Sequence, residues 1–234
     1  MNISVILPAY KESENIKSLL PKLNKALIDL KIDYEILVID TMKPMDNSEQ
    51  ICIDNNVTYI NRHGGNLYGD AIRTGISAAI GNYIVIMDSD GSHNPEDIKR
   101  FYVEINKNND NLIIGSRYCK GGNSHNGYML KSMSWILNFT YRIVFGLKVK
   151  DVSDSFRMYE AKKLKNITLE CENFDIVEEI LIRLKLKYKD LKIKEVPIYF
   201  NKRIYGESKR DLIKFVKSYL RTMVKLYNIK KNYK

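Results

Sequence analysis

A run of apolar residues that ends in two acids constrains the fold of this chain more than any other feature. Residues 83–87, Tyr-Ile-Val-Ile-Met, have no polar alternation and lead directly into Asp88-Ser89-Asp90. An uninterrupted apolar run of this length is typical of a strand that is buried on both faces. The sequence therefore predicts a buried strand whose C-terminal end carries two carboxylates.

Asp88 and Asp90 are expected on the same side of the chain, because side chains alternate along a strand. Two carboxylates about 4 Å apart repel by roughly 4 kcal/mol at an effective dielectric of ~20, so they need a proton or a cation. Mg²⁺ and Mn²⁺ choose oxygen ligands, and Mg²⁺ is commonly held by one or two carboxylates together with phosphate oxygens. The pair predicts a metal site that binds a nucleotide diphosphate. The alternative is that both acids cap the next helix, which already has a start signal in Asn94 and Pro95.

Strands and helices alternate over the first half of the chain. Apolar runs predict strands over residues 3–7, 34–39, 57–60, 83–87 and 112–118, with helices over 16–30, 71–79 and 95–106 between them. This order predicts an α/β fold with a mainly parallel, Rossmann-like, doubly wound sheet and helices on both faces. Ligands of such sheets bind outside the carboxyl ends of the strands, where Tyr10, Glu12, Asp40, Asp88 and Asp90 all fall.

The pattern is less regular after residue 118. A polar, Gly-rich loop over 121–127 could cover or uncover a site, and helices are expected around 128–142 and 178–186. Residues 193–200 contain Pro197 and are predicted to form an edge strand. A last helix, about 211–227, is predicted to be basic and amphipathic. Its apolar side comprises Leu212, Phe215, Val216, Tyr219, Leu220, Met223, Val224 and Tyr227.

The positive charge is concentrated at the C-terminal end. Residues 201–234 carry eleven Lys and Arg against two acids, whereas the first 200 residues carry 27 against 26. This distribution argues against a general nucleic-acid-binding surface and favours one face that meets an anionic membrane. Packing of the last helix on the domain is the alternative. We predict a catalytic domain over residues 1–209 and a basic helix and tail over residues 210–234.

Two further observations bear on the compartment. No apolar run approaches the ~18 residues of a membrane-spanning helix, and the N-terminus enters a strand without a leader. Cys52, Cys119 and Cys171 are odd in number and far apart, which predicts free thiols instead of disulfides or a zinc site. We expect a cytoplasmic protein that is peripheral at the cytoplasmic face of a membrane.

Several different short motifs are distributed along nearly the whole chain. They are Val5–Glu12, Val38–Asp40, Tyr68–Ala71, Met87–Glu96, Gly115–Tyr118, Ser155–Arg157 and Glu195–Ile198, followed by Arg203, Gly206, Ser208 and Lys209. Together these motifs resemble family 2 glycosyltransferases, specifically the polyprenyl-phosphate (dolichyl-phosphate) mannose or glucose synthases. The resemblance implies a GT-A fold, an inverting mechanism, Mg²⁺ or Mn²⁺, and GDP-mannose or UDP-glucose as the donor.

The resemblance also implies roles for individual residues. The ends of the first two strands would hold the base and ribose of the donor through Pro8, Ala9, Tyr10, Glu12 and Asp40. The metal and the diphosphate would be held by Asp88, Ser89 and Asp90. The donor and acceptor phosphates would be bound by Arg117, Lys131, Arg203 and Lys209. A phosphate acceptor is already an anion, so it needs positive charge more than it needs a general base.

The chain departs from the family pattern at four places. A single acid ends the second strand, in Asp40-Thr41, and the loop after it lacks the usual Gly-Ser-Pro-Asp. Gly91 stands where a third metal ligand is common, Lys131 where an Arg is usual, and Asp154-Ser155 where Ser-Gly is usual. These departures leave room for other functions.

Three alternatives to the family reaction stay open. Asp154 could be the base of an enzyme that glycosylates a saccharide hydroxyl in surface-polysaccharide assembly. The chain could also be a nucleotide-sugar-binding subunit without turnover, or a nucleotidyltransferase on a similar fold. Our prediction is transfer of mannose or glucose to a polyprenyl phosphate at a membrane that is reached through the basic helix or a membrane-protein partner.

Overall fold

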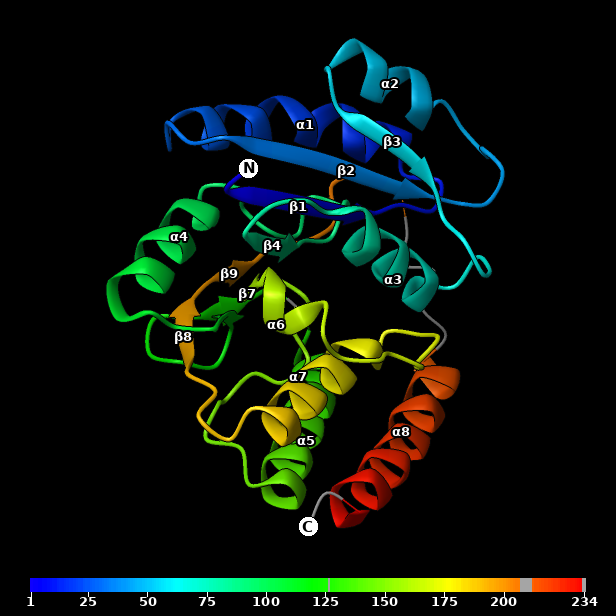
Figure 1. The fold of residues 1–234 in the computed structure, drawn as a ribbon. Helices are drawn as coiled ribbons and strands as arrows, with labels where there is room; N and C mark the ends of the chain where they lie inside the picture. The colour runs from blue at the N-terminus through cyan, green and yellow to red at the C-terminus, as the bar shows by residue number, and fades with distance from the viewer. Residues whose placement is uncertain (126, 207–211, 233–234) are drawn as a thin grey trace.

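A computed structural model describes residues 1–125, 127–206 and 212–232. Its centre is a seven-stranded sheet in the order β3-β2-β1-β4-β7-β5-β8 (Figure 1). The strands are β1 (Ile3–Pro8), β2 (Tyr34–Asp40), β3 (Thr58–Asn61), β4 (Tyr83–Ile86), β5 (Leu112–Ser116), β7 (Arg157–Glu160) and β8 (Ile193–Pro197). The pairs that include β7 are antiparallel and the other pairs are parallel. The predicted mainly parallel sheet is confirmed.

Helices cover both faces of this sheet (Figure 1). On one face lie α1 (Ser13–Ile28), α2 (Ser48–Asp54) and α4 (Asp97–Asn108). On the other lie α3 (Tyr68–Ala78), α6 (Ala161–Leu164) and α7 (Ile176–Lys187), with α8 (Leu212–Asn232) packed beside α7 and α5 (Tyr128–Phe145) beside α8. Val5 packs on the first face and Ile6 on the second, as the alternation of side chains in a strand requires. Burial of both faces explains why the strands lack polar alternation.

The antiparallel strand β7 was not predicted from the sequence. It lies between β4 and β5, with Arg157 opposite Ile86 and Tyr159 opposite Ile84. It is four residues long and follows a polar segment, so its own sequence gives little strand signal. The insertion is important for the site because it brings residues 151–156, here called the 151–156 loop, next to the end of β4.

Other boundaries differ in smaller ways. α4 begins at Asp97 instead of Pro95, because residues 94–97 form a turn in which the Asp97 N–H donates to the Asn94 carbonyl (3.1 Å). β8 is an edge strand, as its proline predicted. It ends at Pro197, and β9 (Tyr199–Phe200) pairs instead with β6 (Asn123–Ser124). This pairing ties the Gly-rich loop to the chain after β8.

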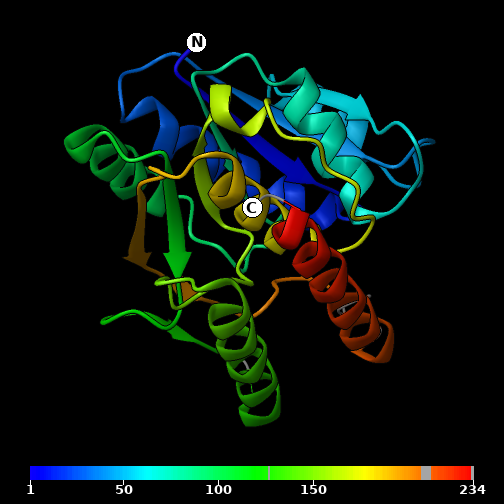
Figure 2. The same ribbon diagram turned by 60° about the horizontal axis from the view of Figure 1, so that its bottom comes forward.

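The described side chains on the predicted apolar side of the C-terminal helix α8 differ in exposure, and those of Leu212, Phe215 and Val216 lie outside the description. Tyr219 is buried against the body of the protein, whereas Leu220, Val224 and Tyr227 are exposed. Figure 2 shows α5 and α8 extending from the same end of the molecule. No helix within the described ranges combines the length and the apolar character needed to cross a membrane.

Candidate active site

The carboxyl ends of β1, β2 and β4 meet at one edge of the sheet, as the sequence predicted. β1 pairs with both β2 and β4, so the segment after Pro8 lies beside residues 88–92, here called the 88–92 turn. The Ser89 hydroxyl donates to the Pro8 carbonyl (2.8 Å) and joins the two strand ends. The predicted donor-binding segments are therefore neighbours in space.

Two cavities open at this edge. The β1 cavity, of about 660 Å³, is lined by predicted residues from both strand ends and by one arginine: Pro8, Ala9, Tyr10, Glu12, Asp88, Ser89, Asp90 and Arg203. The α5 cavity, of about 520 Å³, lies against helix α5 and includes Arg117. Asp88, Asp90, Phe174 and Arg203 line both cavities. The two acids lie where the cavities meet.

Asp88 is held from several directions at this junction. The Ser155 hydroxyl donates to its Oδ1 (2.9 Å), and the Tyr68 hydroxyl lies 3.4 Å from the same oxygen. Burial raises the pKa of Asp88, and the neighbouring Asp90 carboxylate raises it further. A cation between the two acids would relieve this repulsion.

The residues present fit a divalent cation. The described part of the chain contains no cluster of three His, Cys, Asp or Glu side chains that could hold a metal alone. However, the Ser92 hydroxyl is buried and has no hydrogen-bond partner among the described residues. Two carboxylates and a hydroxyl, together with diphosphate oxygens, are the oxygen ligands that Mg²⁺ and Mn²⁺ prefer. Asp88 and Asp90 are therefore suited to hold such an ion.

Arg203 and Glu12 form an ion pair across the β1 cavity. The two guanidinium nitrogens Nη1 and Nη2 lie 2.7 and 2.9 Å from the Glu12 carboxylate, and Nε lies 3.5 Å from Asp90 Oδ2. Although burial lowers the pKa of Arg203, Glu12 and Asp90 raise it above its usual range. Arg203 thus places a permanent positive charge beside the predicted diphosphate site.

Residues 201–206 cross over the 88–92 turn. The Asn201 N–H donates to the Ser92 carbonyl (2.8 Å), and the Ile204 N–H donates to the Asp90 carbonyl (3.1 Å). Gly91 has φ +80° there, and a Cβ on it would lie 2.4 Å from Ile204 Cδ1. A side chain at Gly91 would therefore strain the backbone of the turn and require the Ile204 side chain to move.

Arg117 lies in a buried ionic network at the α5 cavity. Its Nε and Nη2 each donate to Asp151 at 2.8 Å, and its Nη2 also donates to the Ser153 hydroxyl (2.9 Å). Asp154 Oδ2 lies 3.2 Å from Nε. Two acids thus already compensate the charge of Arg117, which is a different setting from the open phosphate clamp that the sequence suggested.

The surroundings of Asp154 do not suit a general base. Its carboxylate accepts the Phe156 N–H (2.9 Å) and faces both Arg117 and His93. Burial alone would raise the pKa of Asp154, but Arg117 and His93 together hold it below its usual value. An ionised carboxylate with a lowered pKa is a weak proton acceptor.

Two predicted site residues do not line either cavity, and a third falls outside the described residues. Asp40 is fully buried, accepts the Tyr59 hydroxyl (3.0 Å) and lines neither cavity. Lys131 is on α5 but is not among the residues that line the α5 cavity. Lys209 falls outside the described residues. The roles predicted for these residues stay predictions.

Arg62 was not predicted from the sequence as a site residue, but it lines the β1 cavity and holds its walls together by hydrogen bonds. This buried guanidinium donates to the carbonyls of Ala9, Asp40 (2.9 Å), Asn66 (3.2 Å) and Leu67 (3.0 Å). It therefore joins the segments that follow three different strands. No spacing in the sequence signals such a role, because the carbonyl partners come together only in the fold.

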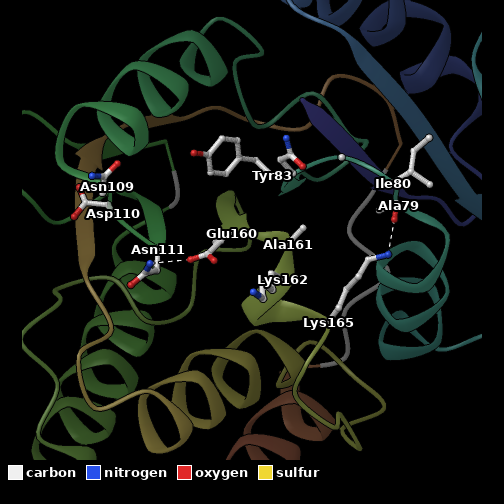
Figure 3. A pocket seen from close by; sticks show the side chains of 12 residues that line it. Ala79, Ile80, Tyr83, Asn109, Asp110, Asn111, Glu160, Ala161, Lys162 and Lys165 are labelled. Carbon is white, nitrogen blue, oxygen red and sulfur yellow. Dashed lines mark hydrogen bonds between the residues drawn. The ribbon is translucent and has the colours of Figure 1, made fainter. Parts of the chain in front are cut away.

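Another hollow, of about 520 Å³, lies at the opposite ends of the strands (Figure 3). It is bounded by Tyr83 at the start of β4, by Asn111 before β5 and by Lys165. Asn111 donates to Glu160 (2.8 Å), and the Lys165 ammonium donates to the Ala79 carbonyl (2.5 Å). Parallel sheets bind ligands at the other edge, and these polar groups already bond to one another, so this hollow is a poor candidate for the active site.

Solved structures of one glycosyltransferase share the fold of this chain. The glucosyl-3-phosphoglycerate synthase of Mycobacterium tuberculosis, crystallised with Mn²⁺, UDP and glucosyl-3-phosphoglycerate, has a TM-score of 0.74 at 18% identity, over 97% of this chain and 80% of that one. The same enzyme with Mg²⁺ and UDP has a TM-score of 0.74 at 18% identity, over 97% and 79% of the two chains. At this identity the likeness concerns the fold, and it confirms the predicted GT-A-like architecture.

Relatives of closer sequence show the family. The dolichol-phosphate mannosyltransferase of Pyrococcus furiosus is 34% identical over 216 residues, which are 89% of this chain and 59% of that protein, so this chain spans less than two thirds of that relative. The undecaprenyl-phosphate mannosyltransferase of Micrococcus luteus is 30% identical over 221 residues, 89% of this chain and 87% of that protein. The family model described as glycosyl transferase family 2 matches residues 4–168. The resemblance seen in the motifs is confirmed, and the chain belongs to glycosyl transferase family 2.

Proposed function

We propose that this protein transfers a hexose, mannose or glucose, from a GDP- or UDP-sugar to a polyprenyl phosphate, with Mg²⁺ or Mn²⁺ bound to Asp88 and Asp90. The observation that carries the proposal is the meeting of two cavities at these two acids. A donor in the β1 cavity and an acceptor in the α5 cavity would come together at this point. The names of the two mannosyltransferase relatives support the same acceptor class.

The lining of the α5 cavity suits an acceptor with a phosphate head and an apolar tail. Positive and hydroxyl groups line one part of it through Arg117, Lys202, Arg203 and Ser153. Apolar side chains of α5 and its neighbours line another part through Leu130, Met133, Leu137 and Val177. A free saccharide would leave this apolar wall without a partner.

The chemistry follows from the charges at the junction. A phosphate oxygen of the acceptor attacks the anomeric carbon, and the bond from that carbon to the donor diphosphate breaks, which inverts the configuration. The bonding electrons leave with the nucleoside diphosphate. Because the diphosphate is proposed to bind at Asp90, and Arg203 lies beside Asp90, the guanidinium can stabilise the charge of that leaving group. A metal ion, when bound, adds charge at the same place. The acceptor brings no proton to remove, so the unsuitability of Asp154 as a base is no obstacle.

A partition experiment tests this function. The protein is incubated with Mn²⁺, a short polyprenyl phosphate and either labelled GDP-mannose or labelled UDP-glucose, and the mixture is extracted with butanol. We expect acid-labile label in the organic phase from one of the two donors. Replacing Arg203 by Ala should lower this transfer about 10²-fold, because one charged contact to the leaving group is lost. Lys192→Ala serves as the matched control, because it removes an exposed basic side chain that directly precedes β8 and lines neither cavity.

Other outcomes have definite meanings. Label that stays in the aqueous phase on a saccharide would replace the lipid acceptor by a hydroxyl acceptor. Binding of the nucleotide sugar without turnover on any acceptor would indicate a binding subunit. Wild-type transfer by Arg203→Ala would contradict the role given to this guanidinium.

We also propose that the protein meets the membrane surface through α5 and α8. Exposed aromatic and aliphatic side chains lie on α5 at Trp135, Ile136 and Phe139, and on α8 at Leu220 and Val224. The rings of Trp135 and Phe139 stack at 5.2 Å. Lys and Arg residues on the same helices would add attraction to anionic headgroups. Location at the cytoplasmic face stays a prediction.

The single tryptophan of the chain makes this contact measurable. Trp135 is 56% exposed, so its emission should move to shorter wavelength when vesicles with anionic lipid are added. Phe139→Ser should weaken vesicle binding about tenfold, because an aromatic side chain no longer enters the interface. The control Ile53→Ser removes an apolar group on α2 that is even more exposed than Phe139, and it should have no effect. Equal binding to neutral and anionic vesicles would contradict the electrostatic part of the proposal.

A further inference from the structure

His93 occupies an unusual place just beyond the 88–92 turn. Its side chain is only 2% exposed, although it adjoins both cavities through its neighbours. The ring stacks on Phe156 of the 151–156 loop, with centroids 4.8 Å apart, and meets Phe200 edge-on at 5.2 Å. His93 is therefore packed between the segment that carries the two acids and the loop that carries Ser155.

The two ring nitrogens face two different partners. Nδ1 accepts the backbone N–H of Asp88 (3.2 Å), and Nε2 lies 3.3 Å from Asp154 Oδ1. A neutral imidazole has one donor and one acceptor nitrogen. The tautomer with its proton on Nε2 leaves Nδ1 free to accept the Asp88 N–H, and it puts the proton on the nitrogen that lies nearer the Asp154 carboxylate.

The 151–156 loop thus reaches Asp88 by two routes. One route runs from Asp154 through His93 to the Asp88 backbone, and the other is the hydrogen bond from the Ser155 hydroxyl to the Asp88 carboxylate (2.9 Å). Asp154 also lies 3.2 Å from the Nε of Arg117, which lines the α5 cavity. A displacement on the acceptor side is therefore connected to the orientation of Asp88.

We propose that His93 is a positioning residue that links the metal-binding 88–92 turn to the acceptor side of the site. It fixes the Asp88 peptide through Nδ1 and is itself fixed by Asp154 through Nε2. Since its Nδ1 accepts a backbone N–H, its Nε2 faces Asp154 and its ring is buried, we assign it neither metal binding nor proton transfer. This inference rests on the proposed function for the identity of the metal and acceptor sites.

Two isosteric substitutions separate the two contacts. In His93→Asn, the side-chain oxygen takes the place of Nδ1 and can accept the Asp88 N–H, but nothing reaches Asp154. In His93→Gln, the amide nitrogen takes the place of Nε2 and can face Asp154, but the acceptor for Asp88 is lost. Both variants lose the same ring stacking, so each is the packing control for the other.

The first measurement is the affinity for Mn²⁺ in the presence of GDP or UDP, read from the electron paramagnetic resonance of free Mn²⁺. We expect His93→Gln to bind Mn²⁺ at least about tenfold more weakly, as is typical when a group that orients a metal ligand is removed, and His93→Asn to stay close to wild type. The KM for polyprenyl phosphate should change in the opposite order, rising in His93→Asn. Equal losses in both variants, or no loss in either, would overturn the proposal.

A second measurement does not depend on metal or acceptor. The ¹⁵N spectrum of the imidazole in the wild-type protein reports which nitrogen carries the proton, and the signal of His93 among the three histidines is assigned by its absence from His93→Asn. A proton on Nε2 is expected, and a proton on Nδ1 would overturn the proposal. If the wild-type protein binds Mn²⁺ but does not transfer sugar to polyprenyl phosphate, the proposed acceptor is wrong. The ratio of the Mn²⁺ affinities of His93→Gln and His93→Asn still decides the role of His93 in that case.

Discussion

Asp88→Asn is expected to lower the rate of the proposed hexose transfer by a factor on the order of 10³, because removing a carboxylate that we propose as a metal ligand forfeits several kcal/mol of leaving-group stabilisation. The same substitution should not destabilise the metal-free protein. Asp88 is a carboxylate whose pKa is raised by burial and by Asp90, so its neutral amide isostere removes a repulsion. Asn also keeps an oxygen that can accept the Ser155 hydroxyl. Activity and stability are therefore expected to change independently.

Transfer assays and thermal unfolding with and without Mn²⁺ and nucleoside diphosphate test this expectation. The ligands should raise the melting temperature of the wild type but not that of Asp88→Asn, since ligands stabilise only the folded state that binds them. Asp97→Asn is the matched control, because Asp97 is also a buried aspartate near this turn but lines neither cavity. Wild-type transfer by Asp88→Asn would contradict the assignment of the metal site.

The parts of the site that the sequence predicted follow from local patterns. An apolar run that ends in Asp88 and Asp90 gives a buried strand with acids at its mouth, and the alternation of strands and helices brings that end beside Pro8 and Tyr10. These conclusions need only the period of the side chains and the rule that ligands bind at the carboxyl ends of parallel strands. Both are properties of short segments.

The parts that could not be predicted depend on distant partners. Glu12 and Arg203 form an ion pair although 191 residues separate them in the sequence. Arg117 forms an ion pair with Asp151 because β7 lies between β4 and β5 and brings the 151–156 loop to this edge. Asp40 shows the opposite case, since a strand end predicted to face the ligand is covered by Tyr59. Pairing and burial of this kind are set by tertiary packing, which no local pattern encodes.

Glu178→Gln is expected to stabilise the protein increasingly as the pH rises from 6 to 9. Glu178 is fully buried in α7. Neither of its carboxylate oxygens accepts a hydrogen bond of ordinary geometry from the described residues. Burial raises the pKa of Glu178 to about 8, against the opposing influence of Arg157, while Asp175 adds to the shift. The folded protein therefore keeps a proton on this carboxyl at neutral pH.

The sign of the pH dependence follows from the protons that each state binds. Between the ordinary pKa of Glu, about 4.3, and about 8, the folded state holds a proton that the unfolded state has lost, so stability decreases as the pH rises through this range. The full loss is on the order of 5 kcal/mol and is complete above the folded-state pKa. A glutamine cannot ionise and escapes this loss.

Denaturant unfolding of the wild type and Glu178→Gln at several pH values between 6 and 9 tests this prediction, and the difference between the two proteins is the quantity to follow. The adjacent Glu179 is an instructive control because it is equally buried but fully paired, accepting the Cys171 N–H (2.7 Å) and the Arg183 Nε–H (2.8 Å). Glu179→Gln should therefore destabilise the protein, on the order of 3 kcal/mol, because it leaves Arg183 without its buried partner. Two neighbouring glutamates of one helix would then respond with opposite signs, as expected if the pairing of a buried charge decides its effect on stability. Parallel pH profiles for the wild type and Glu178→Gln would show that Glu178 is ionised in the folded protein.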